Sequence, residues 1–300
     1  MYPKPRIFIS VPLDQSLTQT QVEIKTAIID KVKSADFDPQ EFNVSGLPIT
    51  TGWTFDNVEK IMQRCHGAII LAFSKWQVVT ANSTLVIMPT EYNHYEGALA
   101  LTLDKDTLII KENGVTSRGI AYTGGGHYIL QIPQNATQQW VSSKEFTTQF
   151  NAWTDAISNR HHVFFGYSGK AADTANRIIK YLTQQVGVRV RDWQVDFKPA
   201  GTILDEIEEA SKKTLGGIFL FTKDDELVNG DHAYAAPRDN VVFEAGYFMH
   251  AAGKERTLII REEDAKMPAD VGGAIYLDLK DRNNTASIET ALRKFIDDRI

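Results

Sequence analysis

The chain has 300 residues, 43% of them hydrophobic and 23% charged, which is enough for two domains of ordinary size that each bury a core. The formal net charge is −6 and the lysines and arginines are scattered, so no basic stripe is present to neutralise the phosphates of duplex DNA or RNA. The single cysteine, Cys65, excludes an internal disulfide and a cysteine-based zinc site.

The opening residues, MYPKPRIFIS, lack the layout of a signal peptide, and no apolar run is long enough to span a membrane. We therefore expect a cytoplasmic protein in a reducing setting. Cys65 has no signature of a Cys–His nucleophile pair around it and is interpreted as a small packed residue. Four histidines without metal-ligand spacing are interpreted as incidental. They are His94, His127, His161 and His162.

The chain presents the same order of elements twice. A short strand pattern at residues 6–11 is followed by a helical pattern at 19–35. After a polar middle, a strand pattern at 161–167 is followed by a helical pattern at 170–187, where the final residue, Gly187, is a helix stop. The two halves therefore begin alike.

Each half continues with an amphipathic helical pattern that runs into an apolar strand. The pattern from Thr54 reaches its strand at Gly67, and the pattern from Thr202 reaches its strand at Gly216. A polar loop is predicted after each strand, and a glutamate follows 29 residues after Gly67 and 28 after Gly216. Both halves then close with the identical strand TLII, so the sequence indicates an internal duplication.

Apolar strands that alternate with amphipathic helices favour parallel sheets covered on both faces. We predict an α/β fold of two flavodoxin-like units, a first domain over residues 1–150 and a second over 161–300, with the boundary between Gln138 and Arg160. The segment 142–160 within this boundary has a helical pattern, so we expect it to pack on a domain rather than to form a free linker. One fused sheet system is the alternative.

The two glutamates, Glu96 and Glu244, are predicted in the first turn of the helix before TLII, at the sheet edge where ligands bind in such folds. Asn93 precedes Glu96 by three residues, which is the spacing of a capping box, so a capping role is favoured for Glu96. Asn240 precedes Glu244 by four, which leaves Glu244 to face the space outside the edge. A mere interaction with the helix dipole is the alternative.

Three ordered segments of the second half resemble a known family. GGIFLFTKDDELV, APRDNVVFEAGYFMHAAGKERTLII and MPADVGGAIYLDL resemble the TIR-like domain of bacterial antiphage effectors of the CBASS and Pycsar class, over roughly Val163 to Ile300. Members of this class cleave NAD. The resemblance therefore implies an NAD glycohydrolase (NAD nucleosidase) that takes NAD as its substrate, needs no cofactor, and uses Glu244 as its catalytic residue.

The resemblance assigns substrate binding to the loop after the first strand, to a T-x-D-D segment and to an R-x-N-V-V-F-E segment. The matching residues are Phe165, Gly166, Thr222, Asp224, Asp225, Arg238 and Asn240. Asp224 and Asp225 are equally compatible with loop-capping acids on a solvated surface, and Arg238 with an ion pair to one of them. Trp193 and Phe197, predicted in the loop after the second strand, are candidates to stack on a base, with packing as the alternative.

In the first half, RIFISVPLD and YNHYEGALAL resemble nucleoside deoxyribosyltransferase-like and nucleotide-sensing domains. The glycine run at residues 123–133 is interpreted as a hairpin or loop. A phosphate cradle is less favoured, because no Lys-Ser/Thr pair follows it.

The leading hypothesis is an effector of two TIR-like units, in which the second domain cleaves NAD and the first senses a cyclic nucleotide or oligonucleotide or mediates assembly. Because constant cleavage would be toxic, a regulated homo-oligomer or filament is expected. Two alternatives stay open: the first domain is an active nucleoside glycosyl hydrolase or transferase with Glu96 as nucleophile, or the protein is a non-catalytic nucleotide-binding scaffold. Hydrolysis and cyclisation of NAD also stay open.

Overall fold

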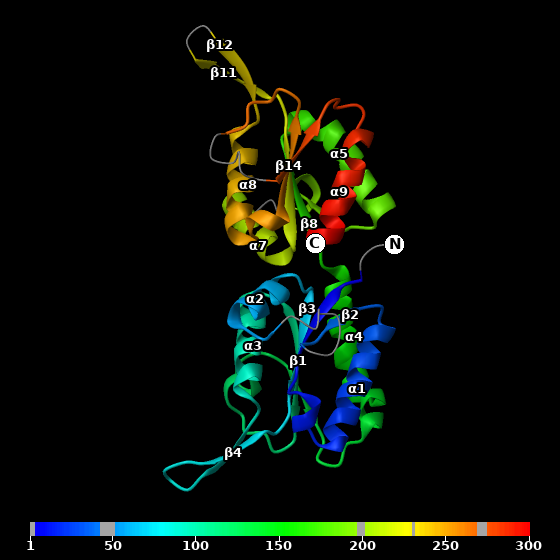
Figure 1. Ribbon diagram of the computed structural model, residues 1–300, viewed down its shortest axis with the longest axis vertical. Coiled ribbons are helices and arrows are strands. Elements are labelled where there is room, and N and C mark those ends of the chain that lie inside the picture. Colours follow the sequence, from blue (N-terminus) through cyan, green and yellow to red (C-terminus); the bar gives the residue numbers. More distant parts are fainter. Residues whose placement is uncertain (1–3, 43–51, 197–201, 230–231, 269–274) are drawn as a thin grey trace. The chain divides into compact units, whose positions relative to one another are not determined.

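The computed structural model describes residues 4–42, 52–196, 202–229, 232–268 and 275–300 (Figure 1). The chain divides into two compact units, Lys4–Asn159 and Arg160–Ile300. No helix within the described ranges is long and apolar enough to cross a lipid bilayer.

The first unit is a parallel sheet of five strands in the order β2-β1-β3-β6-β7. The strands are β1 (Arg6–Ser10), β2 (Asp38–Gln40), β3 (Gly67–Ala72), β6 (Asp106–Glu112) and β7 (Ile129–Ile132). Four helices cover it, with α1 and α4 on one face and α2 and α3 on the other (Figure 1). They are α1 (Gln19–Ser34), α2 (Phe55–Gln63), α3 (Glu91–Thr102) and α4 (Lys144–Asn159).

The second unit repeats this plan, with its strands in the order β9-β8-β10-β13-β14, again all parallel. The strands are β8 (Val163–Tyr167), β9 (Val190–Asp192), β10 (Gly216–Phe221), β13 (Thr257–Glu262) and β14 (Ile275–Leu279). Helices α5 and α9 pack on one face, and α7 and α8 on the other. They are α5 (Ala172–Tyr181), α7 (Ile203–Lys213), α8 (Asp239–Ala251) and α9 (Ala286–Arg299).

The prediction of two flavodoxin-like units is confirmed, and the fused-sheet alternative is wrong for the described residues. Thr54 and Thr202, where the two amphipathic patterns begin, are the N-caps of α2 and α7, and their side chains each accept a hydrogen bond from a backbone N–H in the first turn. Gly187 ends the helical segment of α5 in the left-handed region, with φ of 86°. The segment at 142–160 forms α4, whose aromatic face packs into the core of the first unit.

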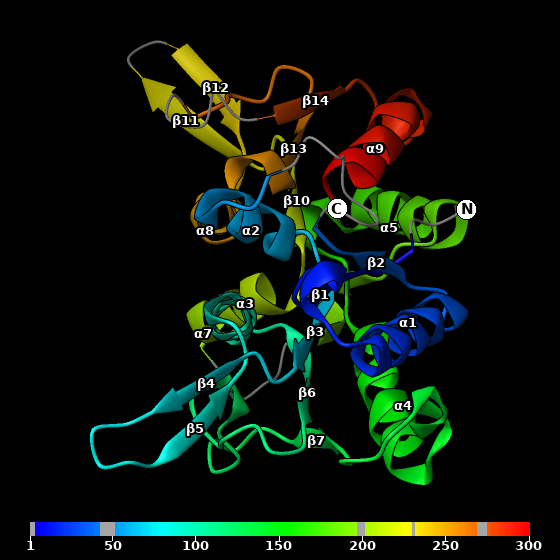
Figure 2. The ribbon, with the colours of Figure 1, turned by 60° about the horizontal axis from the view of Figure 1, so that its bottom comes forward.

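The loops predicted after β3 and β10 are instead antiparallel hairpins. The first pairs β4 (Trp76–Val79) with β5 (Leu85–Met88), and the second pairs β11 (Asp225–Asn229) with β12 (His232–Ala236). Each hairpin projects from its own sheet (Figure 2). The strands of each hairpin pair with each other rather than with the main sheet, and spacing alone does not reveal this.

Of the two interpretations of the glycine run at 123–133, the loop is confirmed for residues 123–128 and the hairpin is wrong. Residues 123–127 form turns, and Ile129–Ile132 form β7, which pairs in parallel with β6. The apolar residues after the glycines therefore complete the sheet edge.

The first residue of the central strand must be a glycine in the second unit. A Cβ built on Gly216 would lie 2.3 Å from the backbone oxygen of Arg256 and 2.6 Å from the side chain of Ile300. Because the backbone oxygen belongs to the segment entering β13, it has little freedom to move. Gly216 thus allows β10 and β13 to approach.

We predict that Gly216→Ala lowers the free energy of unfolding by about 1–3 kcal/mol, as overpacking does in a well-packed interior. Gly246→Ala is the matched control, because nothing lies within 4 Å of its added Cβ and the residue is in α8. It is expected to stabilise by up to about 1 kcal/mol through helix propensity. Thermal denaturation, monitored by circular dichroism, measures the change in stability of each variant. Equal effects of both substitutions would contradict the packing assignment.

Candidate functional site

Both glutamates occupy the same helical position. Glu244 is the sixth residue of α8, whose N-cap is Arg238, and Glu96 is the sixth residue of α3, whose N-cap is Thr90. The predicted position in the first turn is therefore wrong, because both helices begin earlier than the spacing from Asn93 and Asn240 suggests. Both side chains lie in the second turn.

Glu244 is a buried carboxyl group for which the described residues provide no hydrogen bond to Oε2. Its residue is 9% exposed. Burial against the aromatic core raises the pKa of Glu244 to about 7. The group is therefore held partly protonated near neutral pH, which is typical of a carboxyl group with a chemical role.

Gly166 makes room for this carboxyl group. A Cβ built on Gly166 would lie 2.8 Å from Oε2 of Glu244 and 2.5 Å from the ring of Phe219. Gly166 lies inside β8, where it pairs with Phe219 of β10, so the bare backbone of the sheet meets α8 at this point. A larger residue at this position would displace the carboxyl group or the ring.

The structure corrects the placement of Phe165. Phe165 and Gly166 were predicted in the loop after the first strand, but β8 continues to Tyr167. Side chains alternate along the strand, so Phe165 points to the core under α5 and α9, while Gly166 faces α8. Phe165 is fully buried in that core and does not share a face with Glu244.

Asp224 joins three segments at the same edge of the sheet. Its Oδ2 accepts hydrogen bonds from Thr222 Oγ1 at 2.6 Å and from Ser168 Oγ at 2.5 Å. Arg282, which precedes α9, lies 3.8 Å from its Oδ1 and forms an ion pair of 2.6 Å with Glu262. The alternative of a loop-capping acid on a solvated surface is wrong for Asp224, because its side chain is 1% exposed.

Asp225 and Arg238 form the predicted type of ion pair, with Nη1 of Arg238 3.3 Å from Oδ1 of Asp225. About half of the Arg238 side chain is exposed, so solvent screens this pair. Lys170 Nζ lies 3.9 Å from the same carboxyl oxygen. Asn240 follows in the first turn of α8 and is exposed. This corner of the edge therefore carries cationic groups near water.

Trp193 does not lie in a loop but begins the short helix α6 (Trp193–Asp196). Its ring centroid is 5.7 Å from that of Tyr167, and it packs against both cores of the unit. Trp193 therefore makes packing contacts, while its Nε1 is buried without a hydrogen-bond partner among the described residues, and its role in substrate binding stays a prediction. Phe197 lies outside the described residues. Sequence reasoning missed Ser168 and Arg282, because only the folded chain brings them to Asp224.

The environment of Glu96 in the first unit differs from that of Glu244. The capping box of α3 is formed by Thr90 and Asn93, so the predicted box of Asn93 with Glu96 is wrong. Glu96 is buried instead, and its Oε1 accepts a hydrogen bond of 2.7 Å from Trp53 Nε1. Burial raises the pKa of Glu96 to about 7, although hydrogen bonds from Ser10 and Trp53 oppose this rise.

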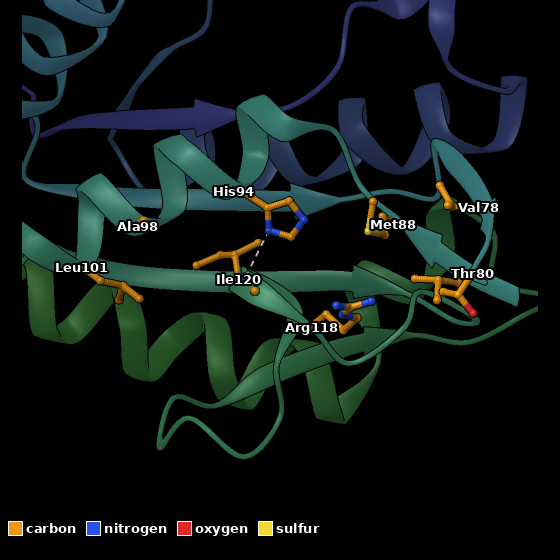
Figure 3. Close-up of a pocket in the computed structure, with 10 residues that line it drawn as sticks. Val78, Thr80, Met88, His94, Ala98, Leu101, Arg118 and Ile120 are labelled. Carbon is orange, nitrogen blue, oxygen red and sulfur yellow. Dashed lines mark hydrogen bonds between the residues drawn. The ribbon is translucent and has the colours of Figure 1, made fainter. Parts of the chain in front are cut away.

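Two cavities flank α3. One, of about 380 Å³, is lined by Glu96 and lies at the C-terminal edge of the sheet. The other, of about 630 Å³, lies between α3 and the hairpin β4–β5 and is mostly apolar (Figure 3). There His94 Nδ1 accepts a hydrogen bond of 3.2 Å from the backbone of Ile120, and burial lowers the pKa of His94. His94 is therefore a neutral acceptor in this cavity.

The described part of the chain contains neither a cluster of metal ligands nor a reactive thiol. No group of three or more His, Cys, Asp or Glu side chains is placed to hold a metal ion within the described ranges. Cys65 is fully buried, and burial raises the pKa of its thiol to about 12. Cys65 is therefore a packed thiol at neutral pH.

Comparison with known proteins finds a family match for residues 162–281 of the second unit. Residues 162–281 match the family model described as "CAP12/Pycsar effector protein, TIR domain". The CD-NTase-associated protein 12 of a Lachnospiraceae bacterium (strain RUG226) is 29% identical over 130 residues, which cover 43% of this chain and 40% of that protein. The Pycsar effector protein BcPycTIR of Burkholderia cepacia is 30% identical over 154 residues, which cover 49% and 51%.

A second CD-NTase-associated protein 12, from Sphingobacterium faecium, is 32% identical over 114 residues, 38% of this chain and 35% of that protein. The chain thus spans about half or less of the length of these three relatives. The match and the relatives together show that the second unit carries a TIR domain of the CAP12/Pycsar effector family.

Proposed function

We propose that the second unit cleaves the N-glycosidic bond of NAD and releases nicotinamide, with Glu244 at the reaction centre, and that the protein is an antiphage-type effector. One observation carries the proposal: a carboxyl group buried without a hydrogen-bond partner among the described residues, at the sheet edge where ligands bind. A carboxyl group that only stabilised the fold would gain from a donor, and Glu244 Oε2 has none in the described ranges.

The chemistry suits a single carboxylate. The nicotinamide ring of NAD is positively charged and leaves as a neutral molecule, taking both electrons of the C–N bond, so no general acid is needed. Positive charge then develops on the ribose, and a carboxylate in apolar surroundings stabilises it more than water does. Water or another acceptor forms the new bond to the ribosyl carbon. The carboxylate of Glu244 is the group that we assign to this charge.

The neighbouring residues take supporting roles in this proposal. Gly166 leaves the space in which the carboxyl group sits. Thr222 and Asp224 hold the strand ends that form the edge, through their hydrogen bonds to each other and to Ser168. Arg238 is the residue we assign to the diphosphate of NAD, because it is half exposed and its ion pair is screened by solvent.

Cleavage of NAD requires control, and the proposal includes activation by a nucleotide signal or by oligomerisation. The relatives named Pycsar effector protein and CD-NTase-associated protein support a function as an effector that responds to another component. The first unit, which lies outside the matched residues 162–281, is the part available for this control. Packing of TIR units against one another is the second route.

The test is nicotinamide release from NAD, followed by chromatography, with and without a panel of cyclic mononucleotides and oligonucleotides. We expect release under at least one condition and a loss of about 100-fold or more in Glu244→Gln, because the amide carries no charge. Glu59→Gln, which alters an exposed glutamate of α2, is the matched control and should retain the activity of the parent.

We expect Glu244→Gln to be at least as stable as the parent at pH 8, so unfolding would not explain its loss of nicotinamide release. The raised pKa means that the ionised carboxyl group destabilises the fold, and its removal gains roughly 1–3 kcal/mol at that pH. Full activity in Glu244→Gln, or no release under any condition by a folded protein, would contradict the proposal.

The dependence of kcat/KM on pH provides an independent test. Only the ionised carboxyl group stabilises the ribosyl cation, and the pKa of Glu244 is about 7. We therefore expect kcat/KM to fall about tenfold for each pH unit below 7 and to level off above it. Initial rates of nicotinamide release between pH 5 and pH 9 measure this. A profile that is flat across pH 7, or that rises toward acid, would refute the assigned role.

A further inference from the structure

The cavity of about 380 Å³ in the first unit is large enough for a small organic ligand, since ligand pockets span about 300–1,000 Å³. It lies at the C-terminal edge of the sheet, next to the N-terminal end of α3. The match to residues 162–281 does not reach it. Its described lining includes three carboxyl groups and four aromatic rings, and their chemistry indicates what the cavity binds.

Three glutamates line the cavity, and two of them are buried. Glu41 is 3% exposed, one of its oxygens pairs with Lys25, and the other has no hydrogen-bond partner among the described residues. Lys25 also pairs with Asp14 at 2.6 Å, so one ammonium group serves two carboxylates. Glu96 contributes a second buried carboxyl group. The cavity therefore offers acceptors for O–H and N–H donors.

Aromatic rings form another part of the wall, beside aliphatic and small polar side chains from residues 9–16. The rings of Trp53 and Tyr92 meet edge to face with centroids 4.6 Å apart. Trp76 is 46% exposed, and its Nε1 donates a hydrogen bond of 3.1 Å to Glu91. Lys75 Nζ lies 5.7 Å from the centroid of Trp76, which shows that this ring already accepts a cation at its face.

The charge of the lining is unfavourable for a phosphate. Among the described residues that line the cavity, Glu41, Glu91 and Glu96 carry carboxyl groups and Lys75 carries an ammonium group. Behind the lining, Lys25 pairs with both Glu41 and Asp14, so carboxyl groups still outnumber ammonium groups by four to two. An anionic ligand would approach an excess of negative charge, whereas a cation would gain from the carboxylates and from the aromatic faces. A hydroxyl group on the same ligand would supply the donor that Oε2 of Glu41 lacks among the described residues.

We propose that this cavity binds a cationic nucleoside-type ligand, which has a flat, positively charged ring joined to a hydroxylated sugar. The ring lies against the aromatic wall of Trp53 and Trp76, and the sugar hydroxyls donate to Glu96 and Glu41. This site is separate from the one at Glu244, and its existence does not depend on NAD cleavage by the second unit.

Isothermal titration calorimetry on the full chain tests the proposal with three matched probes. Nicotinamide riboside carries the cationic ring and the sugar, nicotinamide mononucleotide adds a phosphate, and inosine has an uncharged ring. We expect nicotinamide riboside to bind at least about tenfold more tightly than either of the others. Chromatography after each titration verifies that the probe is intact. Equal or tighter binding of inosine or of the mononucleotide, or no binding of the riboside, would overturn the proposal.

Two variants locate the binding. Glu96→Gln should weaken it about tenfold, because a charged acceptor becomes neutral while the bond from Trp53 can persist. Trp76→Ala changes an exposed residue and should weaken binding of the riboside without loss of fold. If Glu96→Gln does not fold, Trp76→Ala alone tests whether the riboside binds in this cavity. Glu59→Gln is the control and should bind as the parent does. Unchanged affinity in folded Glu96→Gln or Trp76→Ala would place the ligand elsewhere.

Discussion

The burial of a carboxyl group at the end of a parallel sheet is the constraint on which the second unit depends. Ionised Glu244 costs folding free energy, since no described residue donates to its Oε2 and an aromatic core surrounds it. Two features hold the carboxyl group of Glu244 in place. Gly166 leaves space beside the carboxyl group, and buried Asp224 fixes the neighbouring strand ends through its hydrogen bonds. A buried carboxyl group without a donor is typical of a chemical site and is hard to explain by stability alone.

The two units show how one fold supports two kinds of site. Glu96 and Glu244 have the same place in the second turn of equivalent helices, and burial raises the pKa of both. Trp53 donates to Glu96, whereas Glu244 has no corresponding donor among the described residues. A bonded carboxylate is suited to hold a ligand, and an unbonded one is suited to meet charge that develops during a reaction. The environment, and not the position, separates the two roles.

Periodicity and spacing were sufficient to predict the central strands with their covering helices, the repeated plan and the edge that holds both glutamates, but not the two hairpins. The predicted helix stop at Gly187 is confirmed, because a left-handed C-cap depends only on nearby backbone groups. The capping role of Glu96 failed because Thr90, one turn earlier, is the better N-cap. The bond from Trp53, which is 43 residues away, and the contact of Arg282 with Asp224 are products of tertiary structure and leave no mark in a local pattern.

The state of Glu244 is the central claim, and its pKa is the most direct measurement. Protein with ¹³C-labelled glutamate carboxyl carbons can be titrated by NMR, and the Glu244 signal is assigned as the one missing from Glu244→Gln. The account predicts a midpoint near 7, because burial disfavours the ionised form. A midpoint near the ordinary value of 4.5 would show a solvated or hydrogen-bonded carboxylate and would contradict the account.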